Sequence, residues 1–391
     1  NKAYQTQTTT TPETTRQAEA WVQKYQQVQL NASLTYTGTF AEKHNLEAMI
    51  GGEYYTYNQF DFEAKTQGSP TDDVPTLNVG SNRTFTRTEK TAYRILSGFG
   101  RINYNYNMKY LLSFTARYDG ISRLKDNRWG FFPGVSVGWN VMEEDFWKDS
   151  KVSGVISNLK PRVSYGVNGN ASGIGAYTLQ GSYNKVTNYN GNAGYLIAAL
   201  PNPGLRWEKT NTFEVGLDLS FFHNRLTTNF TYYNRLTSDK YAALSFPTTI
   251  GFSSVTNNNG ELRNQGLEME FSGRIIETKD WSWNAGLNVA FNKNKIVSLP
   301  DNGLERNRQS AFQVYTGNGD EKMWVGGYQE GYEPNILYIY QVDGIYKSYD
   351  QIPGNLIRKY GSYTYYGPDA WNQLTADQQN AKTNFPIQPG D

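Results

Sequence analysis

The feature that most constrains this chain is a strict alternation of apolar and polar residues over long segments. In residues 27–40 the odd positions hold Gln, Asn, Ser and Thr, and the even positions hold Val28, Leu30, Ala32, Leu34, Tyr36, Gly38 and Phe40. A period of two predicts a β-strand with one apolar face. At about 3.3 Å per residue this segment spans roughly 46 Å, whereas globular strands usually stop after about 5–6 residues. Tilted by about 45°, it would still cross a hydrocarbon core of ~30 Å.

The same alternation predicts ten strands, at residues 27–40, 46–62, 94–105, 110–118, 131–141, 159–168, 212–221, 225–236, 265–276 and 281–292. Charged side chains in these strands fall on the polar face, except Arg94, which lies at a strand end where a long side chain can reach water. The residues that we expect to face the lumen of a barrel are Arg101, Arg117, Arg162, Glu214, Asp218, Glu268 and Glu270.

Strand length and connection length together favour a transmembrane barrel over a soluble sandwich, which would also keep charge off its inner face. No run of 18 apolar residues exists, so a helical membrane protein is excluded. Short connections at 41–45, 106–109, 222–224 and 277–280 alternate with longer ones, as short periplasmic turns alternate with long extracellular loops in outer-membrane barrels. We therefore expect an all-β fold, a transmembrane antiparallel β-barrel, with barrel strands in residues 1–292. Residues 293–391 would form a long extracellular segment, with one or two further strands in 334–347.

Tryptophans cluster near the predicted strand ends. Trp139, Trp281 and Trp283 lie toward the short turns, and Trp129 and Trp207 lie toward the long connections. Such positions suit an aromatic girdle, which places rings at the level of the lipid headgroups. The alternative is a set of ordinary core aromatics that cap a sandwich.

Composition and motifs give little support for an enzyme. Lys plus Arg is 37 and Asp plus Glu is 36, which provides no basic surface for nucleic acid. Cysteine is absent, and the two histidines, His44 and His223, lie in predicted short turns, where we expect solvated side chains. The acidic pair 143–144 is best explained as solvated loop charge. We expect no catalytic residue, no metal site and no cofactor.

The long connections are rich in tyrosine and asparagine. Exposed tyrosines beside Asn, Gln and Ser can stack on and hydrogen-bond to neutral polar ligands such as sugars or peptide backbones. Alternatively, these residue types simply populate such loops. The candidate ligand-binding residues are Tyr177, Tyr183, Tyr189, Tyr363 and Tyr365.

Residues 117–147, which read RYDGISRLKDNRWGFFPGVSVGWNVMEEDFW, resemble the barrel signature of SusC/RagA-type TonB-dependent outer-membrane transporters. Segments 159–170 (LKPRVSYGVNGN), 201–218 (PNPGLRWEKTNTFEVGLD) and 258–270 (NNGELRNQGLEME) also resemble family segments and follow in the family's order. The similarity covers most of the chain. The RYDG and NRWGFFP runs are fairly specific, whereas the alternating segments are not.

The resemblance implies a plugged barrel of about 22 strands in a Bacteroidetes-type outer membrane. It also implies energy input from the TonB complex, a SusD-like surface lipoprotein as partner, and an oligosaccharide or oligopeptide as ligand. No TonB box, plug or terminal aromatic strand is found, so we expect the middle of a longer protein whose barrel continues beyond the chain. TonB would then act through the missing N-terminal part. A passive porin and a soluble glycan-binding β-protein remain as alternatives.

Overall fold

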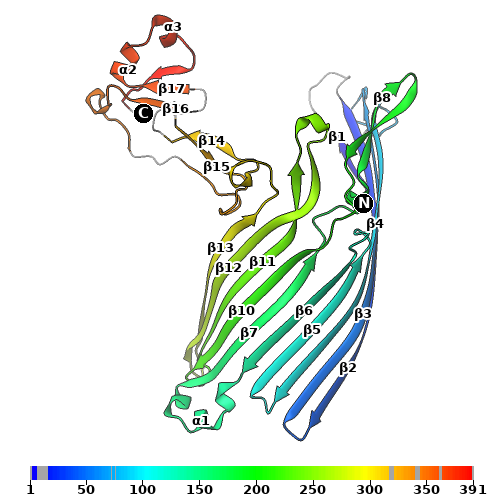
Figure 1. Cartoon of the computed structure of the whole chain (residues 1–391), viewed down its shortest axis with the longest axis vertical. Coiled ribbons are helices and arrows are strands. Elements are labelled where there is room, and N and C mark those ends of the chain that lie inside the picture. Colours follow the sequence, from blue (N-terminus) through cyan, green and yellow to red (C-terminus); the bar gives the residue numbers. More distant parts are fainter. Residues whose placement is uncertain are drawn as a thin grey trace. The chain divides into compact units, whose positions relative to one another are not determined.

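The alternating segments form one large antiparallel sheet (Figure 1). The computed structural model describes residues 2–6, 16–71, 73–74, 76–316, 321–339, 344–360 and 363–389. The sheet has 11 strands in the order β1-β2-β3-β4-β5-β6-β7-β10-β11-β12-β13. All ten predicted strands are confirmed, and β1 is added. The strands are β1 Lys2–Thr6, β2 Gln17–Phe40, β3 His44–Gln67, β4 Asn82–Tyr106, β5 Tyr110–Ile121, β6 Trp129–Trp139, β7 Ile156–Asn170, β10 Glu208–Phe221, β11 Leu226–Ser245, β12 Ser254–Glu277 and β13 Ser282–Ser298.

Strand register gives the sheet two chemically different faces. On one face, called the apolar face here, Leu112 lies opposite Val137, which lies opposite Val163. On the other, called the polar face, Ser113, Ser136 and Ser164 form the adjacent row. The apolar face is uncovered in the part of unit 1 that the structure describes: Leu34 is 74% exposed and Ile50 is 68% exposed. A sandwich would bury this face under a second sheet, so the single layer favours the barrel.

Several strands continue beyond the apolar alternation. The predicted connections 63–93 and 237–264 were too long, because β3 runs to Gln67 and β12 begins at Ser254. The uninterrupted apolar stretch of this face ends at a row that contains Val28, Thr56 and Arg94, and the next row holds Gln26 and Asn58. Backbone pairing persists where that face becomes mixed, with Lys24 opposite Phe60 and Phe60 opposite Lys90, so apolar periodicity could not locate these strand ends. The exceptional Arg94 therefore marks the edge of the apolar band.

The connection between β7 and β10 carries a small separate hairpin, β8 Ser182–Tyr189 and β9 Asn192–Ala199. On both sides of the hairpin the chain folds against the sheet and builds a buried core. This core, called the ledge core here, comprises Ile121, Leu124, Phe132, Ala171, Ile174, Leu179, Leu205 and Trp207. A connection predicted only to be long is thus held to the wall by hydrophobic packing.

At the opposite end of the sheet, called the short-turn end, β6 and β7 are joined by three short helical turns (Figure 1). They are η2 Val141–Glu143, α1 Asp145–Lys148 and η3 Lys151–Gly154. No helix in the described part of the chain is long and apolar enough to span a membrane.

The chain divides into two compact units, Asn1–Asn292 and Lys293–Asp391. The second unit contains a hairpin of β14 Phe312–Tyr315 and β15 Lys322–Val325, and a three-stranded sheet of β16 Ile357–Tyr360, β17 Tyr363–Tyr366 and β18 Asn384–Pro386. It also contains η6 Glu305–Asn307, η7 Tyr349–Gln351, α2 Pro368–Asn372 and α3 Ala376–Gln379. The further strands predicted within 334–347 are absent from 334–339 and 344–347, and residues 340–343 lie outside the described residues.

Candidate functional site

Charged side chains on the polar face are joined into cross-strand pairs. Arg117 of β5 donates through Nε to both carboxylate oxygens of Asp119, at 2.7 and 2.9 Å. Its Nη2 donates to Glu53 Oε2 and Ser97 Oγ, both at 2.9 Å, so three strands meet at one guanidinium. The planar fork of arginine suits such multiple recognition. Arg117 thus links side chains of three adjacent strands and leaves a hydrogen-bonded, polar surface.

Arg162 plays the same part on β7, two strands further along the sheet. It donates to Asp218 at 3.3 Å, to Asn229 at 3.1 Å and to Thr231 at 2.6 Å. Its guanidinium lies over Gly216, where a methyl group would overlap it. Arg101 pairs with Glu47 at 2.9 Å and Arg235 with Glu214 at 3.1 Å. Glu268 and Glu270 lie opposite Thr231 and Asn229, so all the residues expected to face the lumen share the polar face.

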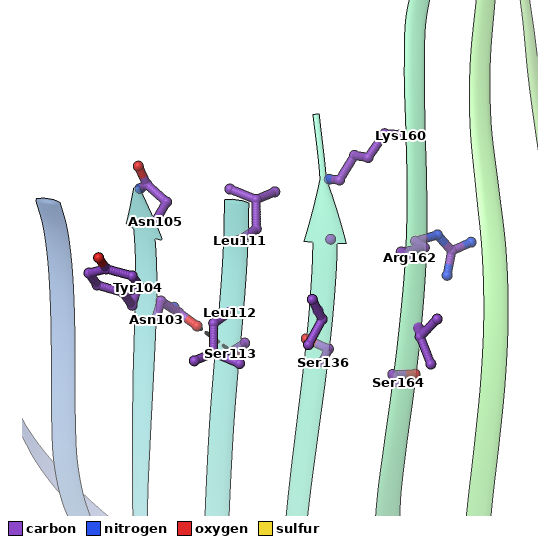
Figure 2. Close-up of a pocket in the computed structure, with 13 residues that line it drawn as sticks. Asn103, Tyr104, Asn105, Leu111, Leu112, Ser113, Ser136, Lys160, Arg162 and Ser164 are labelled. Carbon is purple, nitrogen blue, oxygen red and sulfur yellow. Dashed lines mark hydrogen bonds between the residues drawn. The ribbon is translucent and has the colours of Figure 1, made fainter. Parts of the chain in front are cut away.

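A shallow cavity of about 420 Å³ lies on the polar face toward the short-turn end (Figure 2). Four adjacent strands line it with both polar and apolar residues, and the polar ones are Asn103, Asn105, Ser113, Ser136, Lys160, Arg162 and Ser164. The small side chains of the central strands keep the wall flat there. Within the described chain Lys160 forms no hydrogen bond or ion pair, so its ammonium is available to a negatively charged or carbonyl group.

The residues of the RYDG and NRWGFFP runs pack rings against glycines. Tyr118 stacks on Trp129 with ring centroids 5.1 Å apart, and Trp129 lies where a side chain on Gly120 would be. The Phe132 ring lies against Gly130 and Gly169 in the same way. A β-carbon at these glycines would meet a ring, which explains why the runs combine aromatic residues with glycine.

The ledge core includes Phe132 of the NRWGFFP run and packs against that run. Phe132 meets Trp207 edge to face at 5.4 Å, and Trp207 Nε1 donates to the Arg128 carbonyl at 2.9 Å. Trp207 is 7% exposed and Leu205 is fully buried, so the expected girdle position of Trp207 was wrong. Loop residues have no periodicity from which burial can be predicted. The only indication in the sequence that Leu205 and Trp207 are buried was that both side chains are apolar.

Aromatic rings form a continuous row on the apolar face at the short-turn end. His44 meets Tyr106 edge to face at 5.0 Å, and Tyr110 stacks between Tyr106 at 6.4 Å and Trp139 at 6.5 Å. His44 was expected to be a solvated turn residue, but it is the first residue of β3 and its Nδ1 lies 2.7 Å from Tyr104 Oη. Its neighbours come from β4, which a local sequence pattern cannot show.

The other expected girdle residues and His223 remain accessible. Trp129 is 45% exposed at the opposite end of the apolar face. Trp283 on β13 is 56% exposed, and Trp281, just before that strand, is 77% exposed. His223 is exposed in the turn between β10 and β11, as expected, and its backbone N–H donates to Ser157 Oγ at 2.7 Å.

Glu144 lies beside this row, where three donors converge on its carboxylate. Tyr110 Oη donates at 2.7 Å, Lys109 Nζ at 2.9 Å and Trp139 Nε1 at 3.1 Å. These hydrogen bonds, the one from Tyr110 foremost, lower the pKa of Glu144 to about 2. Neighbouring Glu143 instead forms an exposed pair with Lys148 at 3.1 Å. The interpretation of both acids as solvated loop charge was therefore wrong for Glu144.

The candidate ligand-binding tyrosines are divided between the two units. Tyr177 is 51% exposed and Tyr183 on β8 is 67% exposed; Tyr189 ends β8, and its side chain lies outside the described residues. In the second unit, Tyr363 and Tyr365 of β17 pack on Phe385 with centroids 5.8 and 5.5 Å apart. Among the described residues no group of three or more His, Cys, Asp or Glu side chains is placed to hold a metal ion.

A long-stranded antiparallel sheet with one uncovered apolar face and one charged face is the wall of a transmembrane β-barrel. Residues 1–382 match the model of the TonB dependent receptor-like, beta-barrel family, and the chain belongs to this family. It is an outer-membrane protein of the SusC/RagA type.

Named relatives support this assignment. The chain is 36% identical to TonB-dependent receptor P3 of Formosa agariphila, over 68% of this chain and 27% of the relative. It is 33% identical to TonB-dependent receptor SusC of Bacteroides thetaiotaomicron, over 76% of this chain and 30% of the relative. The structure of the RagAB peptide transporter is 28% identical with a TM-score of 0.69, covering 85% of this chain and 35% of that chain.

The chain therefore spans less than a third of the length of these curated relatives. These relatives are two receptors and a transporter.

Proposed function

We propose that the protein containing this chain imports a large nutrient ligand, an oligosaccharide or an oligopeptide, across the outer membrane in a TonB-dependent manner. A SusD-like surface lipoprotein would be its partner, and a plug domain outside this chain would receive the work of TonB. The observation that carries the proposal is the family match over residues 1–382, together with 33% identity to SusC. The chain itself would serve as barrel wall and ligand-facing loop, without catalysis.

The faces of the sheet support an orientation in the membrane. In this proposal the apolar face contacts lipid, the polar face lines the lumen, and the short-turn end lies in the periplasm. Trp129 and Trp139 begin and end β6 on the apolar face. Their separation is roughly 33 Å along the strand, or about 25 Å across the bilayer at a tilt of ~40°. That height equals the apolar band of ~25 Å in outer-membrane barrels, so both can serve as girdle residues with Trp281 and Trp283.

The long connections would provide the ligand and partner surfaces. In this assignment, residues 1–292 supply strands and loops of the barrel, and residues 293–391 form an extracellular segment. Tyr177, Tyr183 and Tyr189 on one connection, and Tyr363 and Tyr365 on the second unit, would offer rings and hydroxyls to a neutral polar ligand. Lumen residues Arg117 and Arg162 would keep the wall polar and hydrated.

The test is uptake by cells that produce the full-length protein. A fluorescent malto-oligosaccharide mixture and a labelled tryptic digest serve as probes for the two ligand classes. Energised import predicts that uptake of one probe stops when the proton gradient is collapsed and falls when the lipoprotein gene is deleted. Uptake that continues unchanged after collapse would instead support a passive porin.

A further inference from the structure

The segment that joins β6 to β7 leaves the sheet on its apolar side. Glu144 accepts hydrogen bonds from Tyr110 and Trp139, whose rings belong to the apolar face. Val141, three residues earlier, is 5% exposed and anchors the start of the segment. The three donors to Glu144 come from β5, β6 and the turn that precedes β5. Residues 140–144 are therefore fixed beside the aromatic row, on the lipid side of the rim, and do not fold toward the lumen.

Beyond Glu144 the same segment exposes large apolar side chains. Phe146 of α1 is 61% exposed, Val152 of η3 is 47% exposed and Val155 is 46% exposed. The Val155 carbonyl accepts a hydrogen bond at 2.8 Å from the backbone of Phe222, which is 54% exposed in the neighbouring turn. These four residues, called the foot here, are contributed by adjacent turns at the same end of the sheet (Figure 1).

Charges of both signs surround the foot. Asp145 and Asp149 are exposed beside the exposed Lys148 and Lys151. Lys151 forms no ion pair within the described chain, and Lys148 is held by Glu143. An apolar surface edged by mixed charges suits a zwitterionic headgroup layer, which offers both a phosphate and an ammonium group. A strongly acidic or basic protein partner would meet like charges.

We propose that the foot lies in the headgroup region of the phospholipid leaflet at the short-turn end, with Phe146 at the boundary of the acyl chains. We choose lipid as the occupant because the foot is continuous with the apolar face. The foot begins at the aromatic row where that face ends, so a lipid leaflet that covers the face also reaches the foot. Apolar side chains on such interfacial segments insert ~5–10 Å into the headgroup and acyl boundary. The inference rests on the proposed contact of the apolar face with lipid.

The experiment uses the full-length protein in bilayers of phosphatidylethanolamine and phosphatidylglycerol, with any cysteine elsewhere in the protein replaced. A nitroxide is attached to Phe146→Cys, and its collisions with oxygen and with a water-soluble nickel chelate are measured. Leu30→Cys, on the apolar face, is the lipid reference, and Asp126→Cys, in the exposed connection after β5, is the aqueous reference. We expect the oxygen-to-nickel ratio at position 146 to exceed that at position 126 several-fold and to approach that at position 30.

Each other outcome has a distinct meaning. A ratio at 146 equal to that at 126, with a high ratio at 30, would overturn the foot and leave the barrel intact. A label at 146 that is immobile and inaccessible to both reagents would show a protein cover and would also overturn the proposal. A low ratio at position 30 would contradict the lipid-facing assignment itself. Phe146→Glu should in addition shorten the lifetime of the protein in bilayers more than Ile250→Glu, since Ile250 is an apolar residue of the opposite end that is also more than half exposed, at 52%.

Discussion

At the scale of single residues, Glu144 is the clearest example of a side chain whose role depends on neighbours distant in sequence. Its partners Lys109 and Tyr110 come from another hairpin, more than thirty positions earlier. The pKa of the Glu144 carboxyl falls from an ordinary 4.5 to about 2, so the folded protein favours the carboxylate. A lowered folded-state pKa contributes stability that is complete above the unfolded pKa and is lost as the pH falls toward the folded pKa.

Glu144→Gln should therefore lower resistance to denaturant at neutral pH. The difference between the original and the variant should shrink as the pH falls from about 4.5 to 2, because the carboxylate is progressively protonated over that range. Urea unfolding of the full-length protein in bilayers over this pH range is the measurement. Glu143→Gln is the matched control, since its exposed pair with Lys148 should contribute little at any pH. A difference that stays constant down to pH 2 would show that the hydrogen bonds, not the charge, matter.

Gly169 gives a second prediction at this scale. A methyl group there would overlap the Phe132 ring, which is 7% exposed and already fills the space beside Gly130 and Trp207. Gly169→Ala should therefore cost about 1–3 kcal/mol of unfolding free energy through overpacking. Gly98→Ala is the control, because its β-carbon would meet no atom within 4 Å. Equal stability of the two variants would mean that the ring moves freely and that the ledge core is loose.

At the scale of elements, adjacent residues of one strand should respond to mutation in opposite ways. Leu217 lies opposite Phe230 on the apolar face, whereas Asp218 accepts a hydrogen bond from Arg162 on the polar face. Leu217→Arg should cost roughly 2–4 kcal/mol if it faces the bilayer midplane. Asp218→Asn should assemble well and alter passage through the lumen. The measurement is folding yield in bilayers, and equal yields would show that the apolar face does not contact lipid.

The centres of the strands could be predicted from sequence because burial alternates with a period of two, and ten of the 11 strands of the main sheet follow from that alone. The strand ends beyond Val28 could not, because polar and apolar side chains mix on both faces there, as where Lys24 lies opposite Phe60, while the backbone ladder continues. The charged residues of the polar face follow from the same period. Glu144, His44 and the ledge core do not, because their contacts join segments far apart in sequence and no local pattern records them.

At the scale of the whole molecule, the connection between β7 and β10 has two parts, one that packs in the ledge core and one that forms an exposed hairpin. Ile174 and Leu179 precede the β8–β9 hairpin, and Leu205 and Trp207 follow it, so the ledge core is complete without the hairpin. The hairpin itself exposes Tyr183, Tyr195, Leu196 and Ile197. An isolated two-stranded hairpin is marginally stable in water. A segment with this exposure contributes little to the fold, and under the proposed function its exposed rings would contact a ligand or partner.

Replacing residues 182–199 by a short Gly-Ser linker should therefore leave assembly unchanged and weaken uptake of the imported probe. Ser182 and Ala199 are paired at the base of the hairpin, so a few residues can close the gap without strain.

Leu205→Ala should have the opposite effect and impair folding of the connection. Removal of this fully buried side chain costs about 2–5 kcal/mol and should release the connection from the wall. Protease resistance of the connection and probe uptake, measured on both variants, separate the two effects. Undiminished uptake without the hairpin would show that the hairpin does not bind the ligand. The polar face of the sheet would then be the next candidate surface, and Arg117 and Arg162 the first residues to mutate.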